Sequence, residues 1–190
     1  MTPPDAALHR DALRLLRGWR PPDEDQEKVR RRFVDHLEEH PDGLRRACFP
    51  AHVTASTLVV SADADHVLLT LHKKAGAWFQ LGGHCEPQDA TLSSAASREA
   101  AEESGVPGLE LDPDPVQLDA HEVPFCHPDG TVAHLDVRFV AVAPADAEHA
   151  VSEESLDVRW WPVDQVPTQD PGLRDLARLA LARLRAHGRS

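Results

Sequence analysis

The sequence is poor in cysteine and lacks long apolar runs. Its three cysteines, Cys48, Cys85 and Cys126, lie far apart in a chain of 190 residues and form no CxxC pair. They therefore predict neither a disulfide framework nor a CxxC zinc site, and we expect a protein of the reducing cytoplasm. No segment approaches the roughly 18 consecutive apolar residues of a membrane helix, and the first residues do not resemble a secretion signal. The sequence thus predicts no membrane association.

Positive charge is also scarce. Lys and Arg total 20 against 32 Asp and Glu, which gives a formal net charge of -12 when the histidines are neutral. This charge opposes binding to a nucleic-acid polymer or to an anionic membrane. A phosphorylated small molecule remains compatible with it, because divalent cations can bridge carboxylates to phosphates.

The length of the chain fits one main domain, and residues 1–50 are expected to form an N-terminal helical extension of it. Apolar residues recur at helical spacing in two segments, which Arg20-Pro21-Pro22-Asp23 separates. The stripe residues are Leu8, Leu15, Leu16 and Trp19 in the first segment and Val29, Phe33 and Leu37 in the second. We expect this stripe to pack on the main domain, residues 51–190.

The main domain is predicted to be of the α+β class. Runs with strand character are followed by polar or glycine-containing turns, and they occupy residues 54–61, 66–73, 78–81, 116–123, 131–142 and 158–161. An alanine-rich helix is expected over residues 90–104. A C-terminal helix should begin at Pro171, capped by Asp170, and bury a stripe of Leu173, Leu176, Ala180 and Leu184.

The stretch that indicates chemistry is residues 82–106, GGHCEPQDATLSSAASREAAEESGV. Residues three and four apart share one face of a helix, so Glu99, Glu102 and Glu103 should project together. Like charges at this spacing are unfavourable unless cations or solvent compensate them, and Mg²⁺ prefers such oxygen ligands. The alternative interpretation is a solvated acidic helix without a function.

The spacing of this stretch resembles the Nudix box, GX5EX7REUXEEXGU, where U is a bulky aliphatic residue. The matching positions are Gly83, Arg98, Glu99, Glu102, Glu103, Gly105 and Val106. The loop before the helix is one residue longer than in the pattern, Ala100 takes an aliphatic position, and Asp89 replaces the usual first Glu, where we expect it to cap the helix. The resemblance extends over about residues 50–165 and implies a Nudix fold, a mixed β-sheet sandwiched between helices.

The resemblance implies a Nudix hydrolase, in which Mg²⁺, or Mn²⁺ in its place, assists the attack of water on phosphorus. Glu99 and Glu103 would be the principal metal ligands. Glu102 would assist them, Gly82 would offer its backbone carbonyl, and Arg98 would orient the cluster. The substrate would be a nucleoside diphosphate linked to another group.

The resemblance leaves more than one candidate for the general base. Many Nudix enzymes take it from a carboxylate outside the helix, and Glu154 or its neighbour Glu153 is the best-placed candidate here. Glu99 is the alternative, because a ligand carboxylate can also position the attacking water. An exposed acidic loop without a catalytic role is the competing interpretation of Glu153 and Glu154.

Several other residues have a structural and a functional interpretation. We interpret His84 as a contact to backbone or substrate rather than a metal ligand, and Cys85 as a buried thiol rather than a nucleophile. The polar face of the 131–142 strand either contacts substrate or faces water, with His134, Asp136 and Arg138 on it. Large aromatic residues in strands are more often core than base-stacking groups, which applies to Trp78, Trp160 and Trp161.

Two other functions compete with hydrolysis. An isopentenyl diphosphate isomerase-like enzyme is disfavoured because REXXEE is intact and His84 precedes Cys85, the reverse of that family's order. A non-catalytic nucleotide sensor is disfavoured because all three glutamates are present. The sequence has no tyrosine, which counts against dinucleoside polyphosphates. Nucleoside triphosphates, nucleotide sugars and other small diphosphates stay open, as do a monomer and a homodimer.

Overall fold

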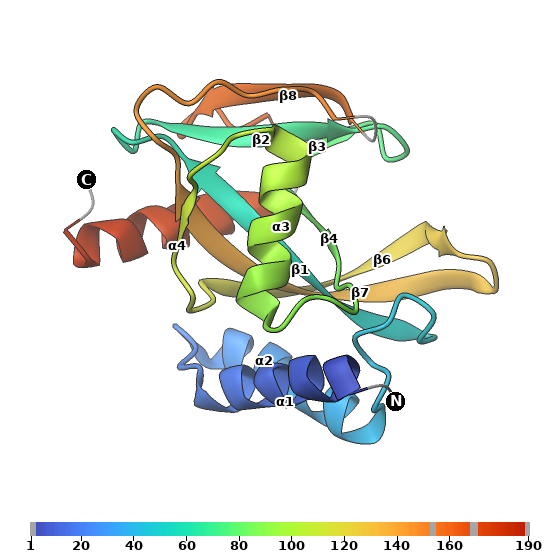
Figure 1. The fold of residues 1–190 in the computed structure, drawn as a ribbon. Helices are drawn as coiled ribbons and strands as arrows, with labels where there is room; N and C mark the ends of the chain where they lie inside the picture. The colour runs from blue at the N-terminus through green and yellow to red at the C-terminus, as the bar shows by residue number, and fades with distance from the viewer. Residues whose placement is uncertain (1–2, 153–154, 168–170, 189–190) are drawn as a thin grey trace.

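The structure, a computed structural model, describes residues 3–152, 155–167 and 171–188 (Figure 1). Its helices are α1 (Pro3–Gly18), α2 (Glu24–Glu39), α3 (Leu92–Ser104) and α4 (Pro171–Ala186). Its strands are β1 (Ala51–Val60), β2 (His66–His72), β3 (Ala77–Phe79), β4 (Leu81–His84), β5 (Glu110–Leu111), β6 (Gln117–His127), β7 (Gly130–Val142) and β8 (Ser155–Pro162). The strands expected from the sequence are present, whereas β4 and β5 were not expected as separate strands. Among the described residues, no helix is long and apolar enough to cross a membrane.

The strands form one mixed eight-stranded sheet. Its central path runs β3-β2-β1-β7-β5, while β4 pairs with β1, β6 with β7 and β8 with β2. The long central strands β1 and β7 run parallel, and the other pairs are antiparallel. Figure 1 shows α3 in front of the sheet, α1 and α2 below it and α4 at its left. The α+β class and the mixed sheet between helices are therefore confirmed.

The two faces of the sheet bury different helices, because successive residues of a strand point to opposite sides. On one face, β1 and β7 pack against α1, α2 and α3, through Val53, Ala55, Leu135, Val137 and Phe139. On the other face, the carboxyl ends of the same strands pack against α4 through Leu58, Val60 and Val140. The C-terminal stripe is buried there as expected, with Leu173, Leu176, Ala180 and Leu184. Its expected cap, Asp170, lies outside the described residues.

Helices α1 and α2 are held on the sheet by apolar burial and by specific hydrogen bonds. Phe33 and Leu37 of α2 are fully buried. The Nε1–H group of Trp19 donates to the carbonyl of Pro115 at 2.6 Å. The amide of Gln26 makes two bonds with the backbone of Leu118, one to its carbonyl at 2.9 Å and one from its N–H at 2.8 Å. The division of the chain at residue 50 stays a prediction.

Helix α3 begins later than the sequence suggested. Thr91 is its N-cap, and Thr91 and Ser94 form a capping box. The expectation that Asp89 caps the helix is wrong, because the longer loop places Asp89 two residues before the cap, where it accepts the N–H of Glu86 at 2.7 Å. The helix ends at Gly105, whose left-handed φ of 67° suits glycine. Its small residues face the sheet, with Ala95, Ala96 and Ala100 buried.

Candidate active site

The acidic face of α3 lies against the two glycines of β4. The N–H of Gly82 donates to Oε2 of Glu103 at 2.9 Å, and Glu103 is only 8% exposed. A side chain on Gly83 would lie 2.8 Å from the carboxyl carbon of Glu99. A side chain on Gly82 would lie 2.3 Å from Cβ of Ser56 on β1. Glycine is thus needed at both positions for β4 to fit between β1 and the carboxylates.

Arg98 ties this acidic face to the loop before the helix. Its guanidinium donates two bonds to Asp89, at 3.0 and 3.2 Å, and another to the carbonyl of His84 at 3.0 Å. It also donates to Glu99 and Glu102, each at 3.0 Å. The bonds to Asp89 are the main cause that raises the pKa of Arg98 well above its ordinary value. Arg98 therefore stays charged and offsets the repulsion among the carboxylates.

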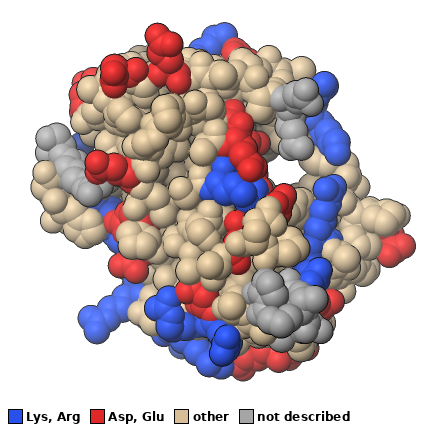
Figure 2. Space-filling model, viewed as in Figure 1, with Lys and Arg blue, Asp and Glu red and all other residues tan. Residues whose placement is uncertain are grey.

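The three glutamates are not equivalent. The side chain of Glu99 is 15% exposed, whereas that of Glu102 is 60% exposed. Glu99 and Glu103 are one turn apart and both approach β4, while Glu102 lies on the flank of the helix with Arg98 beside it. Figure 2 shows positive and negative side chains adjacent near the centre of the face on which α3 lies. The predicted Glu154 and its neighbour Glu153 lie outside the described residues.

The donor set on α3 fits a hard divalent cation. The carboxylates of Glu99 and Glu103 supply oxygen ligands, and both lie next to the backbone of β4. Mg²⁺ and Mn²⁺ prefer such oxygen ligands over nitrogen or sulfur. In the structure, Gly82 contacts Glu103 by donating its backbone N–H to the carboxylate. The use of the Gly82 carbonyl as a ligand stays a prediction.

Cys85 follows the glycines but is not placed as a nucleophile. Burial raises the pKa of its thiol to about 12, so the reactive thiolate is not populated near neutral pH. The side chain packs against the apolar core beneath α3. Cys85 is half-buried rather than fully buried, and its interpretation as a structural thiol stays a prediction.

On the polar face of β7, Asp136 and Arg138 are buried rather than exposed to water. Asp136 accepts bonds from Ser56 at 2.8 Å and Gln80 at 3.0 Å. Arg138 pairs with Asp136 at 3.0 Å and with Asp119 at 2.9 Å. Asp136 and Arg138 are 3% and 2% exposed. The interpretation as a face open to water is wrong for Asp136 and Arg138, because polar side chains of β1 and β6 pack against them, while His134 is half-buried. Contact of these residues with substrate stays a prediction.

Trp78, Trp160 and Trp161 are half-buried and pack against the core from its edge. The rings of Trp78 and Trp161 meet edge to face, with centroids 5.3 Å apart. Both pack against the core under α4, while Trp160 packs against a third apolar cluster, which contains Ala100 of α3. The guanidinium of Arg159 lies 5.8 Å from the ring of Trp78 and 5.6 Å from that of Trp161.

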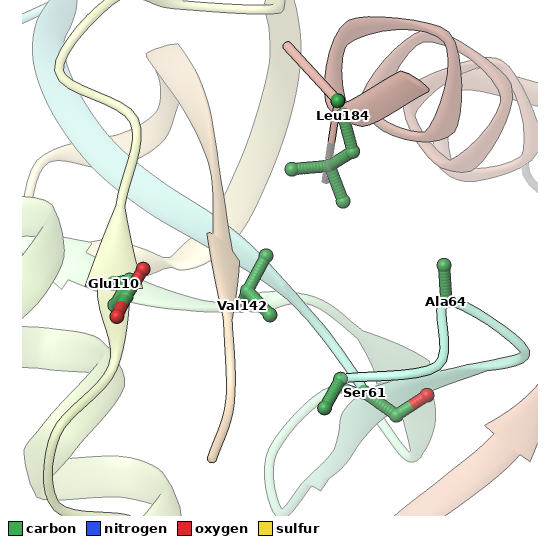
Figure 3. A pocket seen from close by; sticks show the side chains of 7 residues that line it. Ser61, Ala64, Glu110, Val142 and Leu184 are labelled. Carbon is green, nitrogen blue, oxygen red and sulfur yellow. The ribbon is translucent and has the colours of Figure 1, made fainter. Parts of the chain in front are cut away.

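A hollow of about 280 Å³ lies elsewhere, between the β1–β2 turn and the end of α4 (Figure 3). Its lining includes one acidic side chain, Glu110, and it shares no residue with α3 or β4: Ser61, Ala62, Ala64, Glu110, Val142, Leu184 and Gly188. This hollow lacks the converging carboxylates of the α3 site. The candidate active site is therefore the surface of α3 and β4.

Sequence reasoning missed a group of side chains that could bind a metal ion. His52, His84, Cys126 and His134 bring one ligand atom each to within 4.8 Å of one another, and we call them the histidine–cysteine cluster. His84 thus has possible metal-ligating partners that lie far from it in the sequence. The sequence signal was the abundance of histidine, 12 residues, but His52, His84 and His134 lie far apart along the chain.

Comparison with known proteins decides the family. The family model for the NUDIX domain matches residues 50–182, which is most of the chain. The chain belongs to the NUDIX family. This confirms the resemblance inferred from the box and makes the protein a Nudix hydrolase. No curated protein matches it.

Solved structures with the same fold are similar to the Nudix part of the chain. A hydrolase of the NUDIX family from Clostridium perfringens is 23% identical, with a TM-score of 0.54, over 72% of this chain and 97% of that chain. The E. coli dihydroneopterin triphosphate pyrophosphohydrolase is 18% identical, with a TM-score of 0.59, over 69% and 95%. A C. elegans Ap4A hydrolase is 17% identical, with a TM-score of 0.52, over 70% and 98%. At these identities the comparison shows a shared fold.

Proposed function

We propose that this Nudix hydrolase cleaves a nucleoside diphosphate linked to another group, in a magnesium-dependent reaction in which water attacks phosphorus. The observation that carries the proposal is the approach of Glu99 and Glu103 to the glycines of β4, with Arg98 bonded to the same loop. Mn²⁺ is the alternative ion, since its ligand preference is similar.

In this proposal the residues of α3 hold the cation and its substrate phosphates. Glu99 and Glu103 are the principal ligands, the Gly82 carbonyl is a further ligand, and Glu102 assists from the exposed flank. When bound, the cation neutralises the diphosphate and lowers the pKa of a bound water. The carboxylates lie on a helix whose small face is buried, so their positions are fixed before substrate arrives.

Arg98 has a positioning role in the proposal. It holds Asp89 through two bonds and the carbonyl of His84 through a third, so it fixes the loop against the helix. The side chain of Asp89 is only 4% exposed, which makes this pair well shielded from solvent. Arg98 therefore keeps Glu99 oriented toward β4 while its charge offsets the repulsion between Glu99 and Glu103.

The general base is proposed to be Glu154, with Glu153 and Glu99 as the alternatives. A base must lie within hydrogen-bond reach of the attacking water. Glu99 meets part of this requirement because it lies on the metal-binding face. The candidates can be distinguished by replacing Glu154 and Glu99 separately with Gln and measuring kcat against pH. Protonation of the general base causes the fall in kcat at low pH, so this fall should be absent only in the variant that lacks the base.

The substrate is proposed to be a small nucleotide derivative. Solved relatives of the same fold have names that refer to dihydroneopterin triphosphate and to Ap4A, and these ligands belong to those proteins. The net charge of -12 favours a small substrate that arrives with divalent cations over a nucleic-acid polymer. The cytoplasmic location stays a prediction, and monomer and homodimer both remain open.

The proposal is tested by a substrate panel with purified protein and Mg²⁺. The panel contains nucleoside triphosphates, nucleotide sugars, ADP-ribose, dinucleoside polyphosphates and prenyl diphosphates, and the readouts are phosphate release and product mass. Turnover by wild type that is lost in a folded Glu103→Gln variant would support hydrolysis at α3. No turnover together with tight metal-independent nucleotide binding would favour a sensor, and a dimethylallyl product would favour an isomerase.

A further inference from the structure

The histidine–cysteine cluster lies on the face of the sheet opposite α3. On β1, Val53 and Ala55 face the core beneath α3, so the neighbouring His52 points to the other side. In the sheet, His52 lies directly beside His134 of β7, and His84 of β4 lies beside Thr54 of β1. The register of three strands thus brings these imidazoles to one patch.

Cys126 closes this patch from the β6–β7 hairpin. The regular pairing of β6 with β7 is interrupted between Val123 and His127, and Cys126 lies in that interruption. Its sulfur approaches Nε2 of His134 at 3.2 Å, Nε2 of His84 at 3.3 Å and Nε2 of His52 at 3.9 Å. The ladder irregularity therefore turns the thiol toward the three imidazoles.

The distances between the four donors match the edges of a small coordination tetrahedron. Nε2 of His52 and Nε2 of His84 are 3.1 Å apart. With zinc–nitrogen bonds of about 2.0–2.1 Å and a zinc–sulfur bond of about 2.3 Å, tetrahedral edges are roughly 3.3 Å for two nitrogens and roughly 3.6 Å for nitrogen and sulfur. The observed separations between neighbouring donors lie around these values, so little side-chain movement is needed.

The hydrogen bonding and burial of the imidazoles favour their neutral, metal-binding form. Nδ1 of His52 lies 3.1 Å from the carbonyl of Cys48, which requires a proton on Nδ1 and leaves the lone pair on Nε2. His52 is fully buried and His84 and His134 are half-buried, and removal from solvent favours the neutral form of an imidazole. Metal-ligating histidines must be neutral, and a backbone carbonyl commonly orients them in this way.

We propose that His52, His84, Cys126 and His134 bind one divalent transition-metal ion, with zinc as the best fit. A set of three imidazoles and one thiolate suits zinc, whereas Mg²⁺ prefers oxygen ligands. Four protein ligands close the coordination shell, which is the arrangement of a structural site rather than a catalytic one. This site is separate from the magnesium site proposed on α3.

Binding has a defined proton balance. The thiol of Cys126 loses its proton to solvent as the sulfur–metal bond forms, and no redox step is involved. The imidazole of His84 carries its remaining proton on Nδ1, so that its Nε2 lone pair faces the ion. One proton is therefore released for each ion bound.

The ion would fix four strands to one another. His52, His84, Cys126 and His134 belong to β1, β4, β6 and β7 in that order. The carbonyl of His84 accepts a bond from Arg98, so the ion would also hold the loop that the acidic helix contacts. We therefore expect the ion to stabilise the whole sheet and to place the β4 loop.

The experiment measures metal content and the spectrum of a cobalt-substituted protein. Wild type is produced with zinc in the medium, washed with Mg²⁺ and analysed by mass spectrometry for bound metals. Cys126→Ala and His134→Ala are compared with the control variants Cys48→Ala and His121→Ala. His121 pairs directly with His134 across the sheet and is outside the cluster, while Cys48 belongs to a second group with His40 and Asp42.

We expect close to one zinc per chain in wild type and in both controls, and loss of that zinc in both cluster variants. Cobalt should give tetrahedral d–d bands and a thiolate charge-transfer band in wild type, and the latter should be lost in Cys126→Ala. Chelation of wild type should lower Tm by roughly 10 °C, as expected when several kcal/mol of metal binding are lost.

Three results would overturn the proposal: wild type without bound transition metal, unchanged zinc in a Cys126→Ala and His134→Ala double variant, or a cobalt spectrum without the thiolate band. If the variants do not fold, the cobalt spectrum and chelation of wild type still decide. Glu103→Gln should keep its zinc whether or not it hydrolyses any substrate. Failure of the hydrolase proposal and failure of the zinc proposal are thereby distinguishable.

Discussion

The two sides of β4 present opposite kinds of metal chemistry. Gly83 lies against the carboxylate of Glu99 on the α3 side, whereas the next residue, His84, joins imidazoles and a thiol on the other side. Carboxylates favour hard cations that exchange water, and the imidazole–thiolate set favours a firmly held zinc. Because successive residues of a strand point to opposite faces, adjacent residues can serve two separate sites.

The two regions also differ in charge. On the acidic side, Glu102 is largely exposed and Arg98 supplies a positive charge among the carboxylates. In the histidine–cysteine cluster, His52 is fully buried, His84, Cys126 and His134 are half-buried, and no carboxylate belongs to the group. A charged surface suits a phosphate substrate that arrives with cations, whereas a set of imidazoles and a thiol suits an ion that stays.

Glu103→Gln should cause the largest loss of activity while leaving the histidine–cysteine cluster unchanged. The substitution removes one anionic ligand, so we expect kcat/KM to fall roughly 10³-fold, which corresponds to about 4 kcal/mol of lost electrostatic stabilisation. Zinc content should not change. Steady-state kinetics on the substrate found in the panel, with metal analysis of the same preparation, checks both.

The matched control is Glu102→Gln, which removes the same charge from the exposed flank of α3. We expect a loss about tenfold smaller than that of Glu103→Gln or less. An equal loss in the two variants would contradict the different roles assigned to Glu102 and Glu103.

Gly82→Ala should damage both regions together. The new methyl group would lie 2.3 Å from Cβ and 2.5 Å from Cα of Ser56, so β4 must move away from β1. We expect a loss of about 3 kcal/mol in the free energy of unfolding and a Tm lower by roughly 10 °C. Thermal unfolding, kinetics and zinc content should all show the damage.

Gly18→Ala provides the control for this substitution, because nothing lies within 4 Å of the added methyl group at the end of α1. Its Tm should equal that of wild type or exceed it slightly. A Gly82→Ala protein with wild-type Tm would show that β4 does not need the close approach.

Arg98→Lys should affect the acidic side with little effect on zinc. Lysine keeps the positive charge but cannot reproduce the two bonds to Asp89 together with the bond to the carbonyl of His84. Loss of such an orienting group commonly costs roughly 10–100-fold in activity, and we expect kcat/KM to fall within that range. Loss of zinc in the same variant would mean that Arg98, rather than the strand pairing, positions His84.

Trp19→Phe should have the smallest effect and should leave both sites intact. It removes the bond from Nε1 to the carbonyl of Pro115 while keeping an aromatic ring in the core. We expect about 1 kcal/mol of destabilisation, or roughly 3 °C in Tm. A change in kcat/KM or zinc content well below Tm would contradict this separation of α1 from the sites.

The acidic site could be predicted from the sequence because its spacing is local. Glu99 and Glu103 are four residues apart, so helix geometry alone puts them on one face. The position of Gly82 and Gly83 beside the acidic helix could also be predicted, because Gly-Gly comes before the helix in the stretch that resembles the Nudix box. The cap was missed because the loop length is not encoded in the helix, and Thr91 rather than Asp89 is its N-cap.

The histidine–cysteine cluster could not be predicted because it depends on strand register. His52 and His134 are adjacent only because β1 and β7 pair in parallel, and parallel pairing leaves no local signature. The same pairing buried Asp136 and Arg138, whose alternation with apolar residues favoured a face open to solvent or substrate. A one-residue shift of β7 would have moved His134, Asp136 and Arg138 to the other face.

The two bonds between Gln26 and Leu118 have a consequence for association. Strand β6 pairs with β7 on one side, so its other side is an edge where backbone N–H and C=O groups could pair with a second chain. The amide of Gln26 occupies one such donor and acceptor pair in the manner of a neighbouring strand. Helix α2 thereby blocks the extension of the sheet across this edge, and a chain that lost it would expose a template for aggregation.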